Sequence, residues 1–160
     1  VEVVAPLDHP ATDSAPFGKA VKARAEDGGG WLGWVVGVDD ISGWEQRLGR
    51  PAAVGHRVRP DGFDLRWKQI GVLDLMADPQ LPYFLAWEVA VDQRPGAGAG
   101  ATPAFERLEI SGDREQVLTW IGGSDEHDPL EEVKVDWVDS EEPGVVAVHF
   151  KCNGGSVRID

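Results

Sequence analysis

The chain has 160 residues, a length that suits one domain, and 42% of them are hydrophobic, which supplies enough apolar material for a core and argues against intrinsic disorder. Its 28 acidic residues outnumber 15 Lys and Arg, and the resulting net charge of −13 repels phosphate backbones, so nucleic acid is not an expected partner. The single cysteine, Cys152, excludes an internal disulfide framework, and no apolar run approaches the roughly 20 residues that cross a bilayer, so we expect a cytoplasmic protein without a membrane partner.

The N-terminal segment predicts a strand and a helix. Residues Val1–Ala5 are rich in β-branched side chains, which indicates a strand, and the absence of an initiator Met suggests that the chain begins inside a longer protein. Residues Pro16–Asp27 contain Ala and Lys and are followed by three glycines, 28–30, which predicts a short helix and its end.

Residues 31–90 predict a strand, a helix and three further strands. The first strand is apolar on both faces, as a buried strand would be, and Gly49 is placed to end the helix. A Pro-Asp-Gly sequence at residues 60–62 predicts the turn of a hairpin, and a connection through Asp74–Pro79 leads to the last strand. The expected elements are Trp31–Val38, Ile41–Leu48, the hairpin Arg57–Trp67, and Tyr83–Val89.

Residues 104–160 predict the same order of elements after a Gly- and Ala-rich linker, Gln93–Pro103. Gly49 lies nine positions after the helix-capping Asp40, and Gly122 lies nine positions after Asp113, which favours a duplicated βαβββ unit and an α+β fold. The expected elements are a strand at Phe105–Ser111, a helix begun by Asp113, and strands at Val133–Val138, Val145–Cys152 and Ser156–Asp160.

Several phrases of the sequence are typical of one protein family. They are Gly-Gly-Trp-Leu-Gly-Trp-Val-Val at residues 29–36, Arg-Pro-Asp-Gly at 59–62, Leu-Pro-Tyr-Phe at 81–84 running to Trp87-Glu88, and the strand at 144–148. With its two βαβββ units, the chain resembles the glyoxalase-like members of the vicinal oxygen chelate (glyoxalase/bleomycin resistance/dioxygenase) superfamily.

The resemblance implies a single glyoxalase-like domain over residues 1–160, in which tandem βαβββ modules form curled mixed sheets. Residues 1–27 would then be the terminal strand and helix of an incomplete first module, followed by modules at 31–90 and 104–160. Members of the superfamily hold a divalent metal through His and Glu, and Glu2 matches a metal-binding carboxylate. The histidine of the preceding module's first strand has no counterpart, and Trp34 occupies a position where a ligand would be expected.

Two residues are the main candidates for chemistry. His149 lies within an apolar strand, where it is either a metal ligand or catalytic group, or a buried neutral histidine with a backbone partner. Glu88 shares a strand face with Phe84 and Ala86, so in an apolar cleft it would serve as general base or metal ligand. The alternative for Glu88 is that it reaches water near the end of its strand.

Arginines and tryptophans are candidates for ligand binding. Arg59 and Arg66 flank the hairpin turn and either bind a substrate carboxylate or pair with Asp61 and Asp64. Most of the seven tryptophans are expected in the core, but some on a concave wall would bind a planar apolar ligand without a metal. The tryptophans with this second interpretation are Trp34, Trp67 and Trp87.

Two functional hypotheses therefore stay open, and both take a small molecule as partner. The first is a divalent-metal-dependent lyase, isomerase or dioxygenase that uses Glu2, Glu88 and His149. The second is a metal-free binding or sequestering protein for an apolar or aromatic ligand, beside which a purely structural or interaction domain is the remaining alternative. Assembly with a copy of itself is compatible with each of them.

Overall fold

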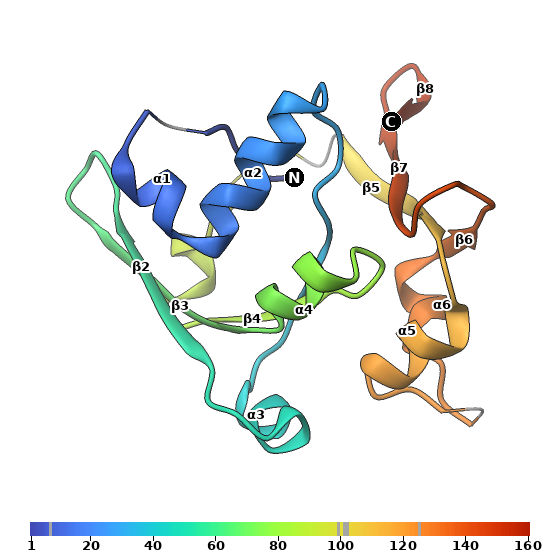
Figure 1. The fold of residues 1–160 in the computed structure, drawn as a ribbon, viewed down its shortest axis with the longest axis horizontal. Coiled ribbons are helices and arrows are strands. Elements are labelled where there is room, and N and C mark those ends of the chain that lie inside the picture. The colour runs from blue at the N-terminus through green and yellow to red at the C-terminus, as the bar shows by residue number, and fades with distance from the viewer. Residues whose placement is uncertain (7, 99, 101–102, 125) are drawn as a thin grey trace. The chain divides into compact units, whose positions relative to one another are not determined.

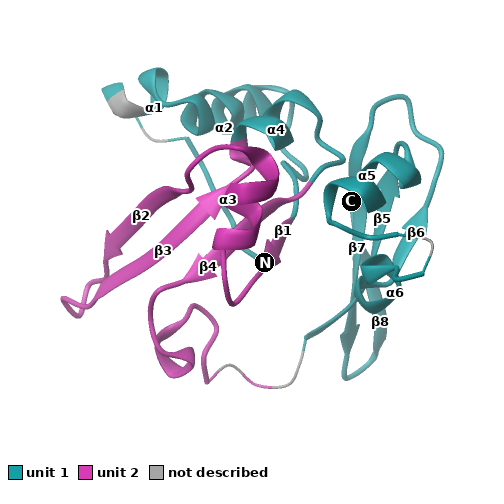
Figure 2. Cartoon of the chain, turned by 90° about the horizontal axis from the view of Figure 1, so that it is seen from below, with its two compact units in different colours: residues 1–34, 73–81, 102–160 teal, residues 35–72, 82–101 magenta. Residues whose placement is uncertain are grey.

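The computed structural model describes the whole chain except residues 7, 99, 101–102 and 125. Contacts between residues divide the chain into two compact units, which Figure 2 shows in two colours. One unit comprises residues 35–72 and 82–101, and the other comprises residues 1–34, 73–81 and 102–160. Each unit contains one four-stranded sheet with both parallel and antiparallel neighbours, which confirms the α+β prediction.

The first sheet lies in the unit of residues 35–72 and 82–101. Its strands pair in the order β1-β4-β3-β2, with β1 parallel to β4 and the other neighbours antiparallel. Figure 2 labels all four strands, and β2, β3 and β4 are also labelled in Figure 1. The predicted hairpin is confirmed, because the Arg59 amide donates to the Phe63 carbonyl and Gly62 adopts φ 86° in the turn. The strands are β1 (Val35–Gly37), β2 (Ala53–Val58), β3 (Asp64–Ile70) and β4 (Tyr83–Trp87).

Short helices connect these strands. The helix α3 (Ser42–Leu48) ends, as predicted, at Gly49, which adopts φ 64°. Its residue Trp44 stacks on Phe84 of β4, with ring centroids 3.6 Å apart, so α3 covers the face of the sheet that carries Phe84. The helix α4 (Val72–Ala77) joins β3 to β4, and the 3₁₀ helix η1 (Val91–Gln93) follows β4.

The second sheet lies in the other unit and pairs in the order β6-β5-β7-β8, with β5 parallel to β6. Asp113 caps the following helix as predicted, because its side chain accepts hydrogen bonds from the amides of Glu115 and Gln116. Ile110 of β5 and Val117 of the helix are both fully buried and contribute to the core of this unit. The elements are β5 (Ala104–Ser111), α5 (Arg114–Trp120), α6 (Pro129–Val133), β6 (Val135–Trp137), β7 (Gly144–Cys152) and β8 (Gly155–Ile159).

The N-terminal segment contains two helices, α1 (Pro10–Ser14) and α2 (Pro16–Glu26). The predicted helix at Pro16–Asp27 is therefore confirmed, whereas the predicted strand at Val1–Ala5 is wrong. The described strands all pair among themselves, and Val1 and Val3 are 85% and 92% exposed. An extended segment becomes a strand only when another strand bonds to it, and this segment has no such neighbour in the described part of the chain.

Other differences from the sequence predictions are local. The strand expected at Trp31–Val38 covers only Val35–Gly37, and Val35 is 46% exposed because β1 is an edge strand that pairs with β4 alone. The helices α1, α4 and α6 were not expected, since helices of five or six residues show too little periodicity to detect. The expected linker Gln93–Pro103 includes residues 99 and 101–102, which lie outside the described residues.

In both sheets a first strand is followed by a helix and three further strands, as predicted, but α4 lies between β3 and β4 whereas α6 lies between α5 and β6. The strands also pair differently. Numbered along the chain, the first sheet has the order 1-4-3-2 and the second has the order 2-1-3-4. The description of residues 1–160 as one domain stays a prediction. None of the described helices combines the length and the apolar character that crossing a bilayer requires.

Candidate functional site

Two of the predicted ligand-binding tryptophans form a pair on the first sheet. Trp67 of β3 and Trp87 of β4 are directly opposite each other, so their side chains lie on the same face. Their ring centroids are 5.8 Å apart and the ring planes meet at 63°, an edge-to-face arrangement. Both side chains are only partly buried. The structure therefore presents two large aromatic surfaces side by side, which we call the tryptophan pair.

The position of Trp67 depends on two neighbours that the sequence analysis did not single out. Gly55 of β2 lies opposite Trp67, and a Cβ atom at Gly55 would come within 2.3 Å of the indole ring. The indole Nε1 donates a hydrogen bond of 2.9 Å to Oε1 of Gln69, two residues along the same strand. The Trp67 ring thus lies against the backbone of β2 at Gly55, the one position of that strand without a side chain. A glycine inside a predicted strand is a signal for such a close approach.

Glu88 shares a face with Phe84 and Ala86, as predicted, because these residues alternate with Trp87 along the chain. That face is the one covered by α3, so Glu88 and the tryptophan pair belong to opposite faces of the first sheet. The carboxylate is 40% exposed and lies 3.7 Å from Nζ of Lys68. The structure thus matches the alternative interpretation of Glu88, a residue that reaches water beyond the end of its strand.

Arg59 and Arg66 both pair with nearby carboxylates. Nη2 of Arg59 lies 2.7 Å from Asp61, and Nε of Arg66 lies 2.7 Å from Asp64. Hydrogen bonds from these guanidinium groups hold the pKa of each aspartate below its usual range. The alternative in which these arginines pair with Asp61 and Asp64 is confirmed.

The remaining predicted residues lie in the other unit. Trp34 is 8% exposed, and its indole Nε1 donates a hydrogen bond of 2.9 Å to the carbonyl of Gln80, which is the environment of a core tryptophan. Glu2 is exposed in a segment without regular structure. His149 of β7 is 7% exposed, and its Nε2 lies 2.6 Å from Oε1 of Glu109.

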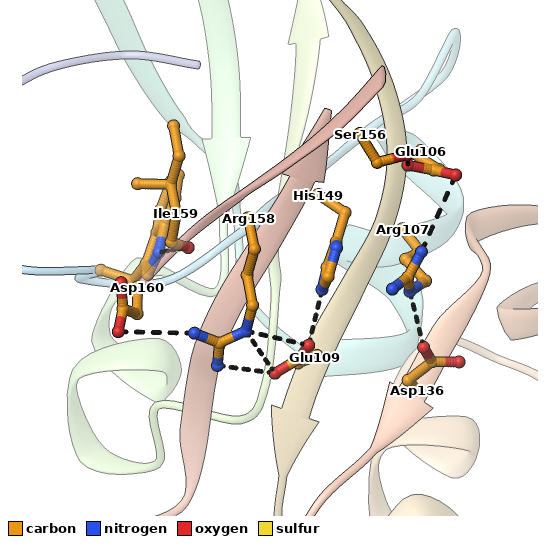
Figure 3. A network of polar contacts seen from close by, with 10 residues as sticks. Glu106, Arg107, Glu109, Asp136, His149, Ser156, Arg158, Ile159 and Asp160 are labelled. Carbon is orange, nitrogen blue, oxygen red and sulfur yellow. Dashed lines mark hydrogen bonds and ion pairs between the residues drawn. The ribbon is translucent and has the colours of Figure 1, made fainter. Parts of the chain in front are cut away.

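Glu109, which the sequence analysis missed, is the centre of a network on one face of the second sheet (Figure 3). Besides His149 it binds Arg158 of β8, whose Nη2 lies 2.8 Å from Oε2 and whose Nε reaches both carboxylate oxygens. A hydrogen bond from Arg158, and to a smaller extent one from His149, lowers the pKa of Glu109 from 4.5 to about 2. His149 is thus buried and hydrogen-bonded, but its partner is the carboxylate of Glu109 and not the backbone group that the structural interpretation expected.

The same face of the second sheet contains a further ion pair and a further hydrogen bond. Arg107 of β5 lies 2.8 Å from Asp136 of β6, and Oγ of Ser156 donates to Glu106. Arg107 and Glu109 alternate with the apolar Leu108 and Ile110 along β5, and this alternation is the sequence signal that identifies the polar face. The network therefore satisfies its charges internally.

Comparison with known protein families supports the resemblance seen in the sequence. Residues 1–122 match the glyoxalase-like domain family, a match that covers the first sheet together with β5 and α5. The chain belongs to this family. Because this family is part of the vicinal oxygen chelate superfamily, the chain is a member of that superfamily. Comparisons with curated proteins and with solved structures found no match.

Membership of this superfamily raises the question of whether the glyoxalase-like domain has residues arranged to hold a divalent metal. Within the described part of the chain, no group of three or more His, Cys, Asp or Glu side chains is placed to do so. Among the predicted ligands, Glu88 is paired with Lys68 and His149 with Glu109. The two oxygens of Glu109 also face the guanidinium of Arg158, which disfavours a second cation there. The described residues do not fit a metal in the arrangement that the structure shows.

Proposed function

We propose that the glyoxalase-like domain binds a small planar aromatic or apolar molecule against the tryptophan pair, without a metal. The observation that carries this proposal is the arrangement of Trp67 and Trp87, which are adjacent on one face of the first sheet and partly exposed. Aromatic side chains bury large areas and stack on planar ligands with few rotatable bonds to immobilise. The pair is therefore suited to a flat ligand.

The fixed orientation of Trp67 supports the proposal. The Gln69 hydrogen bond and the close approach to Gly55 restrict the indole before any ligand arrives. A preorganised surface loses less conformational freedom on binding, so more of the contact energy is available for affinity. The opposite face of the same sheet offers less for a flat ligand, because Trp44 already stacks on Phe84 there.

The expected partners and location rest on the composition of the chain as well as on the tryptophan pair. The partner is a small molecule, bound by one chain or by an assembly of copies. Nucleic acid is not proposed, because the net charge of −13 would repel it. A cytoplasmic location remains the prediction drawn from the single cysteine.

The test is a titration of intrinsic tryptophan fluorescence with naphthamide, a neutral planar aromatic compound. We expect saturable quenching in the wild type and about tenfold weaker binding in Trp87→Leu, since the variant loses one stacking partner. Trp137→Phe, on β6 of the second sheet, is the matched control and should bind like the wild type. Unsaturable quenching, or equal affinity in Trp87→Leu, would contradict the proposal.

Elemental analysis of the same preparation tests the metal-dependent hypothesis independently. A stoichiometric divalent ion that is retained by the wild type and lost in both Glu88→Ala and His149→Ala would favour that hypothesis over ours. Binding of naphthamide by protein without a stoichiometric metal would support the metal-free proposal.

A further inference from the structure

Arg57 occupies a distinctive place beside the tryptophan pair. On β2 it lies two residues from Gly55, which is opposite Trp67, so Arg57 and the tryptophan pair share one face of the first sheet. Its own partner across the hairpin is Leu65. Because β2 is an edge strand, no second strand lies on its other side in the described sheet. The Arg57 side chain is exposed.

Arg57 also differs from the other arginines on the strands. Arg66 pairs with Asp64, Arg107 with Asp136 and Arg158 with Glu109. The side chain of Arg57 has neither an ion pair nor a hydrogen bond to any described residue. The chain has 28 acidic residues against 15 Lys and Arg, so a shortage of carboxylates does not explain this.

The face itself explains why Arg57 has no partner. Strand register places eleven residues of the four strands on the face of the tryptophan pair, and Arg57 is the only charged one among them. Asp64, Arg66 and Lys68 alternate to the opposite face. Beyond the end of β2, toward the turn, the next charged residue is Arg59, whose guanidinium forms an ion pair with Asp61. A ligand on the tryptophan pair would therefore meet one unneutralised positive charge and no strand carboxylate.

We propose that the ligand is a planar aromatic carboxylate, whose ring lies on the tryptophan pair and whose carboxylate binds the guanidinium of Arg57. This inference rests on the proposed function and adds the charge of the ligand. Diagonal neighbours on adjacent strands are about 7–8 Å apart, a span that the arginine side chain and a ring substituent bridge together. The guanidinium presents two parallel N–H donors to a carboxylate, which selects an anion of planar geometry.

The test compares naphthoate with naphthamide, which have the same ring system but differ in charge. We expect wild-type protein to bind naphthoate about tenfold more tightly than naphthamide, because a charge-assisted pair is added, and salt should reduce this preference. Arg57→Gln should bind both compounds with the affinity of wild type for naphthamide. Arg66→Gln is the matched control, from the neighbouring strand but the opposite face, and should keep the preference.

The outcomes separate this inference from the proposed function. Equal affinity of wild type for the two compounds, or a preference that survives in Arg57→Gln, would overturn the role of Arg57 while leaving binding at the tryptophan pair intact. Failure of both compounds to bind would overturn the proposed function and this inference together. Circular dichroism checks that Arg57→Gln and Arg66→Gln fold like the wild type, as exposed substitutions on strands should.

Discussion

The two sheets of this protein use their polar residues in opposite ways. On the second sheet, Glu109 binds both His149 and Arg158, so the charges of that face neutralise one another. On the first sheet, the face of the tryptophan pair keeps Arg57 without a partner among the described residues. Ion pairs between charged side chains of one face stabilise the fold, but they leave no unpaired charge with which a ligand could interact. An unneutralised charge beside a partly exposed aromatic surface is the feature on which the proposed binding face rests.

The sheets also differ in topology, although in both a first strand is followed by a helix and then by three further strands. In the first sheet the last strand, β4, returns beside β1, whereas in the second sheet β6 lies beside β5 after the crossover through α5 and α6. The order of elements along a chain therefore does not determine which strands pair. Each sheet has to be considered by its own register when residues are assigned to a face.

The largest effect is expected from filling the space above Gly55. In Gly55→Val the new side chain would collide with the Trp67 ring, which a Cβ atom alone would approach to 2.3 Å. We expect a loss of about 3 kcal/mol in the free energy of unfolding, together with a changed near-ultraviolet circular dichroism spectrum, because the indole must leave its position. Urea unfolding measures the first effect.

Ala53→Val is the control for Gly55→Val, since Ala53 lies two residues earlier on the same strand, faces the same side and is exposed. This control should be neutral or slightly stabilising, because valine favours strands. If Gly55→Val unfolds at the same urea concentration as Ala53→Val, the close packing of Trp67 on β2 is refuted.

A smaller effect is expected from Glu109→Gln in the second sheet. This substitution keeps the shape of the side chain but removes the negative charge that faces Arg158 and His149. We expect a loss of about 2 kcal/mol near neutral pH, typical of hydrogen bonds between charged groups. Glu88→Gln in the first sheet is the comparison: its carboxylate is 40% exposed and 3.7 Å from Lys68, so its loss should stay below about 0.5 kcal/mol.

The pH dependence of the Glu109 contribution has a definite sign. The pKa of Glu109 falls from its ordinary value of 4.5 to about 2 on folding, so its contribution is fully present above 4.5. As the pH drops through this window the folded carboxylate takes up a proton, and the stability difference between wild type and Glu109→Gln should shrink. A difference that stays constant over this range would show that the charge of Glu109 does not stabilise the fold.

The sequence was sufficient to predict those elements that have local signals. Asp113 begins α5, Gly49 ends α3, and the Pro-Asp-Gly turn joins β2 to β3, because each depends on residues within one turn of itself. The strand at Val1–Ala5 failed because strand formation depends on a partner that the local sequence does not contain.

The site residues also divide into those with a local sequence signal and those that depend on strand pairing. The composition of β3 and β4 indicated Trp67 and Trp87, but their adjacency, and the contact of Trp67 with Gly55, depend on the register between strands. Register also decides that Arg57 shares their face while the predicted Arg66 does not. Glu109 was missed for the same reason, since 40 residues separate it from His149 along the chain. Residues brought together by strand pairing cannot be identified from spacing alone.

Effects smaller than those of Gly55→Val and Glu109→Gln are expected at two helix ends, where the two units place different residues in the left-handed conformation. The helices α3 and α6 both end in a left-handed residue, but α3 uses Gly49 at φ 64° and α6 uses Lys134 at φ 56°. A side chain with a Cβ atom is strained in this region, whereas glycine is not. We therefore expect Lys134→Gly to raise the free energy of unfolding by about 1 kcal/mol and Gly49→Ala to lower it by a similar amount, as measured by urea unfolding. The two changes in the free energy of unfolding should have opposite signs, because glycine removes strain at Lys134 and alanine introduces it at Gly49. A stabilising Gly49→Ala would mean that helix propensity outweighs the left-handed strain.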